Sequence, residues 1–414
     1  MPCPFALRWR RPGTLLYYRD TMGHVKLNSP VLALVLGVML TVSTADTPVC
    51  SAALKVFEGE ELASWSREGC SFDAGAKAIT LLTDRPVSSV FSEGPPAGIR
   101  HARGRATSPE IPATEPFDQI IVSWNALCPE GSWVVIEARA RLKDRWTKWF
   151  NLGWWTGDDR LFRRTSPEPQ KDADGRVDTD VLLLTSPASA VQLRVTLCAR
   201  DPEKSPVLRR AACSLSRSGA SPREESTRSS SGAVVLDVPE ISQLSYPPRG
   251  NVWCSPTSVV MVLNYWAAER DNPLWKTDVP KAAAGIHDLR WGGTGNWTFN
   301  TAFAGSLPGI SAVCTRLNGF ADVEKWIRQG VPVVLSISNN VLHGRGESGG
   351  GHLIVCVGFD EKGNPVVNDP YADLTKGQRV RRTYPRDRLL KAWWSSLGTV
   401  YLILPEDRPA GGGE

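Results

Sequence analysis

The chain has 414 residues, 42% of them hydrophobic, which is long enough for two or three domains with their own cores. Its formal net charge is +5, from 48 basic and 43 acidic residues. Five of the basic residues and one acid fall within the first 45 positions, so the remainder is nearly neutral. A nearly neutral remainder gives no reason to expect a strongly basic surface, and we expect no nucleic-acid partner.

The amino terminus has the pattern of a secretory signal peptide. An apolar run at 31–42, VLALVLGVMLTV, is too short to span a membrane comfortably, and the small residues STA follow it. We predict a leader over 1–45 that is cleaved after Ala45, and Met22 as an alternative start. The protein is then expected outside the cytoplasm, either secreted or in the periplasm or at the cell surface, without a membrane anchor. An uncleaved anchor is the alternative.

The cysteine content agrees with export. Nine cysteines occur, and disulfides form readily in oxidising compartments. Their pairing cannot be deduced from the sequence. None of the spacings resembles a zinc site, so no metal centre is predicted.

A serine-rich segment divides the rest of the chain. Eight of the eighteen residues at 214–231 are serine, mixed with charged residues and without apolar periodicity. Such a composition cannot bury enough apolar surface to become ordered, so we predict a flexible linker at 213–232. The linker would separate a domain at 50–212 from a domain at 233–405, and a disordered tail would follow at 406–414.

The first domain has the pattern of an all-β structure. Short segments rich in β-branched and aromatic residues alternate with turn residues, and no long helical period occurs. The clearest segments are 119–124, 132–142, 148–155, 180–185 and 190–199. We predict a multidomain chain whose first domain is a β-sandwich of jelly-roll type.

Four tryptophans of this domain allow two interpretations. Trp146, Trp149, Trp154 and Trp155 either form a platform on which a polysaccharide stacks or fill the core and rim of the sandwich. Filling the core is the more common use of such residues, and we favour it.

The second domain mixes helix and strand. The segment SPTSVVMVLNYWAAE is apolar on nearly every face, which indicates a buried central helix. A second helix is predicted at 321–330, where apolar residues recur at helical spacing before a glycine. Strands are predicted at 331–337, 352–359, 365–369 and 398–404. Helix followed by antiparallel sheet is an α+β pattern.

Cys254 stands at the start of the predicted central helix. Pro256 falls in the first turn, where proline is tolerated, so the thiol lies beside unpaired N–H groups at the positive end of the helix dipole. Such a site lowers the pKa of a thiol and favours the thiolate. Cys314 and Cys356 lie instead in strand-like apolar runs, where a buried, inert thiol is the usual state.

A nucleophilic cysteine needs a base, and His352 is the best placed histidine. It follows SGGG and begins a strand, whereas His287 and His343 lie in loops. The predicted hairpin brings VVNDP beside the start of that strand, so Asp369 can orient the imidazole while Asn368 points to the opposite face. The other interpretation of Asp369 is a turn residue before proline.

An acyl-transfer site also needs donors for the developing oxyanion. Gln243 precedes Cys254 by eleven residues. Its side-chain amide could join the backbone N–H of Cys254 in an oxyanion hole. A lone glutamine is weak evidence, but its place before the cysteine, histidine and aspartate makes it informative.

The order glutamine, cysteine, histidine, aspartate is that of a known family. The segment 236–404 resembles the papain-like cysteine peptidases of the bacteriocin-processing (double-glycine) type, in an exported form. The motifs that carry the resemblance are VPEISQ, WCSPTSVVMVLNYW, GGGHLIVCVGF and VVNDP. The first domain, with SWNA and WTKWFNLGWW, is similar to a β-rich domain found beside such peptidases in some bacterial proteins. GNWTFNTAFA resembles a segment of the active-site cleft, which makes Asn296 and Trp297 candidates for substrate binding. Trp253, next to Cys254, is a third candidate.

The resemblance implies hydrolysis of peptide bonds in a peptide or protein outside the cytoplasm. Cys254 would be the nucleophile, Gln243 an oxyanion donor, His352 the base and Asp369 its orienting acid. No metal or organic cofactor is needed for this reaction. Two alternatives remain open, namely a cell-wall peptide amidase or transpeptidase with the same chemistry, and a non-catalytic binding protein on the peptidase fold.

Overall fold

The computed structural model describes residues 52–84, 86–223 and 232–408. The predicted leader lies outside the described residues, as do 224–231 of the predicted linker and 409–414 of the predicted tail. Within the described part of the chain, no helix is both long and apolar enough to span a membrane.

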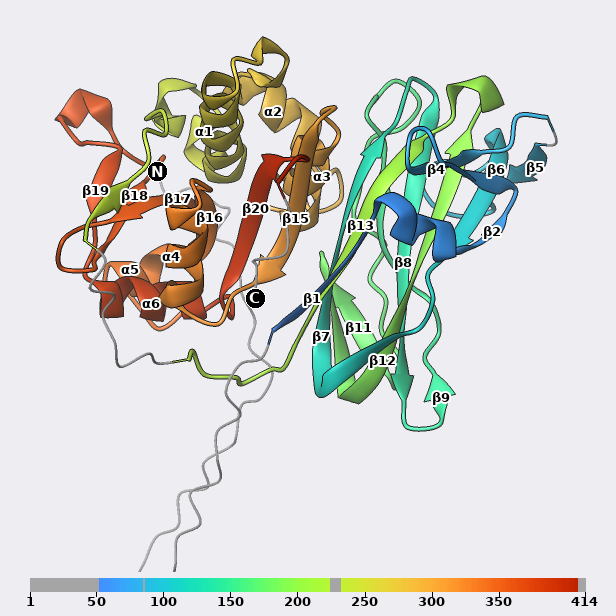
Figure 1. Cartoon of the computed structure of the whole chain (residues 1–414), viewed down its shortest axis with the longest axis horizontal. Coiled ribbons are helices and arrows are strands. Elements are labelled where there is room, and N and C mark those ends of the chain that lie inside the picture. Colours follow the sequence, from blue (N-terminus) through green and yellow to red (C-terminus); the bar gives the residue numbers. More distant parts are fainter. Residues whose placement is uncertain (1–51, 85, 224–231, 409–414) are drawn as a thin grey trace, which may run out of the picture.

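Two domains lie side by side (Figure 1). The first is built almost entirely of strands, and the second combines helices with a separate sheet. The prediction of a β-rich first domain and an α+β second domain is therefore confirmed.

Residues 53–216 form one large network of hydrogen-bonded strands. Its main path runs β10-β8-β12-β7-β13-β4-β3, and every pairing is antiparallel. The strands are β1 (Ala53–Glu58), β2 (Ser66–Glu68), β3 (Cys70–Asp73), β4 (Ala78–Leu81), β5 (Val87–Val90), β6 (Arg100–Thr107), β7 (Ile111–Leu127), β8 (Ser132–Leu142), β9 (Arg145–Trp146), β10 (Phe150–Trp155), β11 (Gly175–Asp178), β12 (Val181–Ala199) and β13 (Val207–Ser216).

The predicted strands at 180–185 and 190–199 are wrong in one respect, because they are parts of the single strand β12. The beginning of β12 pairs with β7 and β11, whereas its end pairs with β6 and β8. The register shifts between Leu183 and Ala188, around Pro187. Proline lacks the N–H that a ladder needs, so the sequence shows a break where the strand only changes partners.

The predicted linker begins too early, since residues 213–216 belong to β13 and pair with β1 and β7. Ser214 and Ser216 are buried and contact the second domain. Ser214 Oγ bonds to Thr315 Oγ1 at 3.1 Å, and Ser216 Oγ accepts from Arg316. These serines satisfy polar groups at a domain junction, which their composition alone did not reveal.

The second domain has a central antiparallel sheet in the order β15-β20-β16-β17-β18-β19, with β14 added along β17. Helix α1 contacts β17 and β20, while α4 and α6 contact β16. Almost every residue of α1 is buried, as predicted for a central helix. The elements are β14 (Val234–Val235), α1 (Cys254–Glu269), α2 (Val279–Ile286), α3 (Trp297–Gly305), β15 (Ile310–Arg316), α4 (Phe320–Arg328), β16 (Val333–Ser338), α5 (Asn339–Leu342), β17 (Gly351–Phe359), β18 (Pro365–Asn368), β19 (Arg381–Thr383), α6 (Arg386–Trp394) and β20 (Thr399–Pro405).

The two domains share a hydrophobic core. Helix α3 lies on the side of the second domain that faces the strands of the first (Figure 1). Its Phe299 is fully buried and packs edge-on against Trp124 of β7 and Trp155 of β10, with ring centroids 6.0 and 5.4 Å apart. The ring of Phe299 also packs against Gly153, and a side chain at this glycine would project toward the ring.

Polar contacts complete this junction. The side chain of Asn125 on β7 donates to Ala312 O at 2.7 Å and accepts from Ala312 N at 3.0 Å, as a neighbouring strand would. The carboxyl of Asp180 accepts from the first N–H of α3, at Trp297, over 2.6 Å. Because such buried partners stabilise each other, the β-domain fixes the position of α3.

The tryptophans favour the core-and-rim interpretation. Trp154 and Trp155 are buried in the β-domain. Trp146 and Trp149 are half-buried on its outer face, where the guanidinium of Arg139 lies 4.6 Å from each ring. Arginine therefore already covers ring surface that a sugar would need.

Candidate active site

Cys254 is the first residue of α1. Trp253 occupies the N-cap position without a side-chain hydrogen bond, and no acidic residue stands in the first turn. The positive end of the helix dipole is therefore directed at the thiol without a carboxylate to neutralise it. Cys254 is half-buried, whereas the other cysteines among the described residues are buried free thiols.

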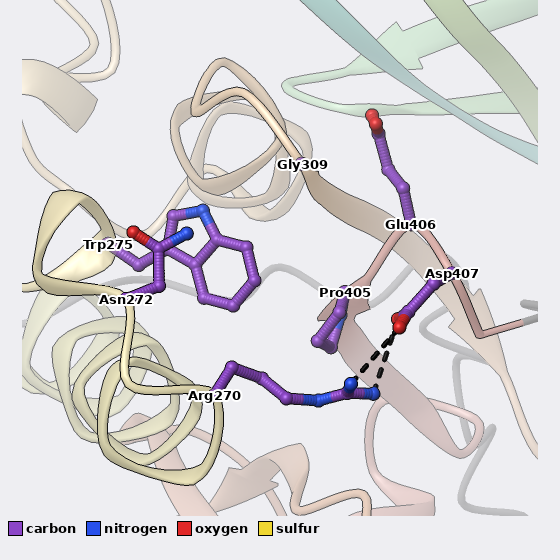
Figure 2. A pocket seen from close by; sticks show the side chains of 7 residues that line it. All are labelled: Arg270, Asn272, Trp275, Gly309, Pro405, Glu406 and Asp407. Atoms are coloured by element: carbon purple, nitrogen blue, oxygen red, sulfur yellow. Dashed lines mark hydrogen bonds and ion pairs between the residues drawn. The ribbon is translucent and has the colours of Figure 1, made fainter.

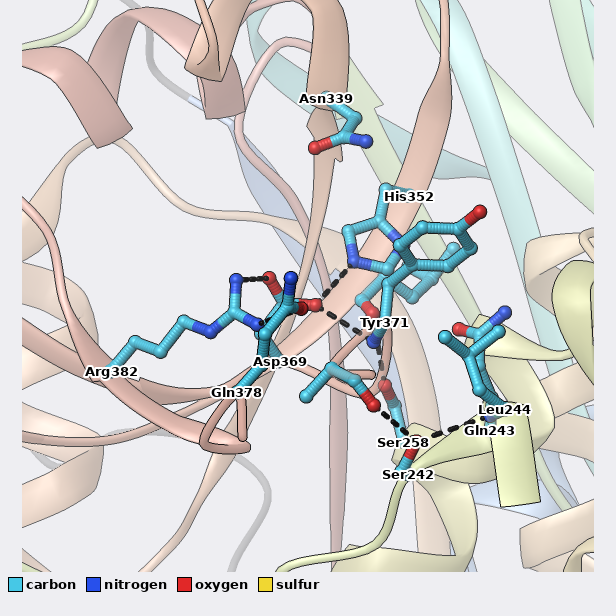
Figure 3. A network of polar contacts seen from close by, with 12 residues as sticks. Ser242, Gln243, Leu244, Ser258, Asn339, His352, Asp369, Tyr371, Gln378 and Arg382 are labelled. Carbon is cyan, nitrogen blue, oxygen red and sulfur yellow. Dashed lines mark hydrogen bonds and ion pairs between the residues drawn. The ribbon is translucent and has the colours of Figure 1, made fainter. Parts of the chain in front are cut away.

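His352 lies at the start of β17, opposite Ile337 of β16. Its ring atom Nε2 is 2.8 Å from Asp369 Oδ1 (Figure 3). The imidazole also interacts with the Cys254 thiol, since each group shifts the pKa of the other. Since Nε2 faces the aspartate, Nδ1 is the nitrogen left for the sulfur. We refer to Cys254, His352 and Asp369 together as the relay.

The charges of the relay reinforce one another. Burial would raise the pKa of the Cys254 thiol, but the hydrogen bond and charge of His352 lower it below its ordinary value. Burial opposes a charge on His352, yet Asp369 and Cys254 raise the pKa of the imidazole to about 10. Burial likewise opposes a charge on Asp369, but His352 keeps the pKa of its carboxyl far below the usual range. The relay therefore favours a thiolate beside an imidazolium.

Asp369 has further partners that hold its carboxylate in place. Oδ1 also accepts from the backbone N–H of Tyr371 at 2.9 Å, and Oδ2 accepts from Tyr384 Oη at 3.2 Å. Arg382 Nη1 approaches Oδ2 at 3.5 Å from the side away from His352 (Figure 3). Asn368 points the other way, as predicted, and donates to backbone carbonyls of the 238–239 segment.

Tyr384 and Arg382 were not found from the sequence. Arg382 lies on β19, whose pairing with β18 brings it near Asp369, and Tyr384 follows that strand. The strand is three residues long and mostly polar, so it carries no recognisable periodicity.

Gln243 is buried in a 3-10 turn (Gln243–Ser245) next to the segment that leads into α1. Its side-chain Nε2 donates to Gly250 O at 2.7 Å, and its backbone N–H donates to Pro370 O at 2.9 Å. It therefore links the loop before Cys254 to the loop after Asp369. One N–H of its amide is not used by the bond to Gly250 and remains a donor.

The other histidines have different partners. His287 Nδ1 lies 3.4 Å from Arg163, and His343 Nδ1 lies 3.0 Å from Asn339 O. His101 is buried in the β-domain, stacked on Phe91. Among the histidines of the described residues, His352 is the one that lowers the pKa of Cys254.

Two family models match the chain. The model of the peptidase C39 N-terminal domain matches residues 54–216, and that of the peptidase C39-like family matches residues 235–401. The chain belongs to the C39-like peptidase family. The resemblance inferred from the sequence is confirmed, and the family indicates a cysteine-peptidase type of function.

One solved structure, described as a C39-like peptidase from Bacillus anthracis, is 20% identical to the chain. The match covers 42% of this chain and 98% of that one, with a TM-score of 0.29. No curated protein matches the chain.

In this C39-like protein, the three predicted substrate-binding residues lie in two places. Trp253 is half-buried beside Cys254. Asn296 and Trp297 are buried at the start of α3, where Asn296 caps the helix and donates to Asp288 at 2.9 Å. The contacts of Asn296 and Trp297 belong to the domain junction, and their role in substrate binding stays a prediction.

A shallow cavity of about 300 Å³ lies away from the relay (Figure 2). Arg270 in this cavity is paired with Asp407 at 3.1 Å. The residues that line the cavity are Arg270, Asn272, Trp275, Gly309, Pro405, Glu406 and Asp407. These residues include no cysteine, serine or histidine. No cluster of three or more metal-ligating side chains occurs among the described residues either.

Proposed function

We propose that the protein is a cysteine peptidase that acts outside the cytoplasm and hydrolyses peptide bonds through Cys254, His352 and Asp369. The observation that carries the proposal is the position of His352, which bonds to the Asp369 carboxylate and lowers the pKa of the Cys254 thiol. A nucleophile, a base and an orienting acid in mutual hydrogen-bond contact are what covalent acyl transfer requires.

In this mechanism the Cys254 thiolate attacks the substrate carbonyl and forms a tetrahedral intermediate. The backbone N–H of Cys254 and the free N–H of Gln243 stabilise the oxyanion. The His352 imidazolium protonates the leaving amine, and the resulting acyl-enzyme releases the first product. His352 then takes a proton from water, which attacks the thioester and restores the thiolate.

Asp369 holds the imidazole in the required orientation. Its bond to Nε2 leaves Nδ1 directed at the sulfur, and the contacts with Tyr371, Tyr384 and Arg382 limit its own rotation. A carboxylate in this position also stabilises the imidazolium that forms with the thiolate.

The finer fold assignments form part of the proposal. A papain-like second domain is supported by a nucleophile at the start of a buried helix and a histidine at the start of an adjacent strand. A jelly-roll-like sandwich is supported by the antiparallel pairing and by β12, which changes partners along its length. Export rests on the leader pattern at 31–45.

The proposal is tested by mass spectrometry of casein and of purified peptidoglycan after incubation with the protein that starts at residue 46. We expect new peptide termini in casein. Release of cell-wall peptides without cleavage of casein would replace the proposal by the amidase or transpeptidase alternative.

In the same assay, Gln243→Ala should lower kcat by about 100- to 1,000-fold, the usual loss when one oxyanion donor is removed. A matched control is Gln329→Ala, which removes an exposed amide at the end of α4 and should leave kcat within about twofold. Equal kcat values for Gln243→Ala and the unchanged protein would show that Gln243 is not an oxyanion donor.

A further inference from the structure

The segment 288–296, which we call the Asp288 loop, presents exposed apolar side chains and contacts the segment that precedes the nucleophile. Leu289 is 48% exposed and Trp291 is 36% exposed. Thr294 Oγ1 in the same loop donates to Val252 O at 3.3 Å. Val252, two residues before Cys254, is itself 62% exposed. Exposed apolar surface therefore adjoins the start of α1.

A buried carboxylate holds the loop in this shape. Asp288 has no exposed surface, and its Oδ1 accepts from the backbone N–H groups of Arg290 and Trp291 at 3.1 and 3.3 Å. Its Oδ2 accepts from Asn296 Nδ2 at 2.9 Å. The ring of Trp291 lies over Gly293 and Gly295, at positions where any side chain on these glycines would collide with it. The indole is thus kept in one place on the loop.

The β-domain supplies the remaining partners of the loop. Ser166 donates to Asp288 Oδ1 from its backbone N at 2.9 Å and from its hydroxyl at 3.2 Å. Thr165 Oγ1 accepts from Arg290 N at 3.2 Å, and Arg164 O accepts from Leu289 N at 3.1 Å. Three consecutive residues of the first domain therefore bind the loop of the second domain that reaches Val252.

We propose that the Asp288 loop and Val252 bind a bulky apolar side chain of the peptide substrate near the scissile bond, and that residues 164–166 of the β-domain hold this loop in its binding shape. The inference rests on the proposed peptidase function. It gives the β-domain a defined part in substrate selection, as a support for the binding surface.

A peptide substrate is the occupant that this surface fits. Val252 and Trp253 directly precede the nucleophile along the chain, so a peptide that presents a carbonyl to Cys254 can contact Val252. Exposed apolar side chains grouped beside a reactive group mark a binding site more often than a random surface. Indole and branched aliphatic groups favour a substrate side chain that is apolar and large.

The test compares two peptide series that differ only beside the scissile bond, one with leucine or phenylalanine and one with glycine or alanine. Trp291→Ala should lower kcat/KM for the bulky series by about 10-fold, mainly through KM, and leave the small series within about twofold. The double variant T165A/S166A should also lower the ratio of kcat/KM for the bulky series to kcat/KM for the small series. Leu274→Ala, which removes an apolar side chain that is 81% exposed elsewhere in this domain, should change neither series.

A second readout separates this inference from the proposed function. The rate at which iodoacetamide alkylates Cys254 should be the same in all of these variants, because the small reagent does not need the loop. If the unchanged protein is alkylated at Cys254 but cleaves no peptide, the proposed function fails. If it cleaves both series equally well, or if Trp291→Ala affects them equally, the loop does not select the substrate. If a folded T165A/S166A protein keeps the same ratio of kcat/KM between the bulky and the small series, the β-domain plays no part in substrate selection.

Discussion

Cys254→Ala should abolish peptide hydrolysis, with a loss on the order of 10⁶-fold in kcat, and should leave the protein folded. The sulfur is the only nucleophile in the relay, so water would have to attack the substrate without a covalent intermediate. The side chain is half-buried and small, and its loss should change the free energy of unfolding by about 1 kcal/mol. The measurements are hydrolysis of a casein-derived peptide and a urea unfolding curve.

Cys356→Ala is the matched control. This thiol is buried within β17, and burial raises its pKa to about 12, so it should remain protonated and inert. The control should keep its kcat and lose some stability. Hydrolysis that survives in Cys254→Ala but not in Cys356→Ala would place the nucleophile elsewhere. If the two variants and the unchanged protein all fail to hydrolyse the peptide, the binding-protein interpretation is favoured.

Phe299→Ala should destabilise the whole molecule by about 3–5 kcal/mol, the range found for loss of a buried phenylalanine. The ring has no exposed surface and fills the space between Trp124 and Trp155, so a cavity would open at the domain junction. Because both domains share this contact, unfolding should remain a single transition that occurs at lower denaturant concentration. Tryptophan fluorescence during urea titration measures it.

Leu274→Ala provides the comparison for stability, since its side chain is 81% exposed and should contribute less than about 0.5 kcal/mol. A loss below about 1 kcal/mol in Phe299→Ala would mean that the junction does not stabilise the fold. Two separate transitions in the unchanged protein would show that the domains unfold independently.

The relay was predictable because its members sit at positions that local patterns define. Cys254 begins a segment that is apolar on every face, and His352 begins a strand after glycines. Asp369 follows the next strand, so a hairpin alone brings it beside His352. The periodicity of neighbouring segments and the geometry of one turn are enough to predict that these three residues lie together.

The junction was not predictable in the same way. Phe299 meets Trp124 and Trp155 only after two domains have folded and packed together. Asp288 likewise accepts a hydrogen bond from Ser166 across this junction, and neither residue belongs to a motif. The serines at the end of β13 have a linker composition, but their hydroxyls bond to β15. Such contacts depend on tertiary packing, which outweighs local composition.

The dependence of Cys254 alkylation on pH tests the central claim most directly. Iodoacetamide reacts with the thiolate, and mass spectrometry identifies the modified cysteine. Because His352 lowers the pKa of the Cys254 thiol, the rate should rise with an inflection clearly below about pH 8.5, the value for a free thiol. In His352→Gln the hydrogen bond and charge of the imidazole are lost while the burial that raises the thiol pKa remains, so the inflection should move to higher pH. An inflection at the same pH in both proteins would contradict the thiolate–imidazolium pair on which the proposed function rests.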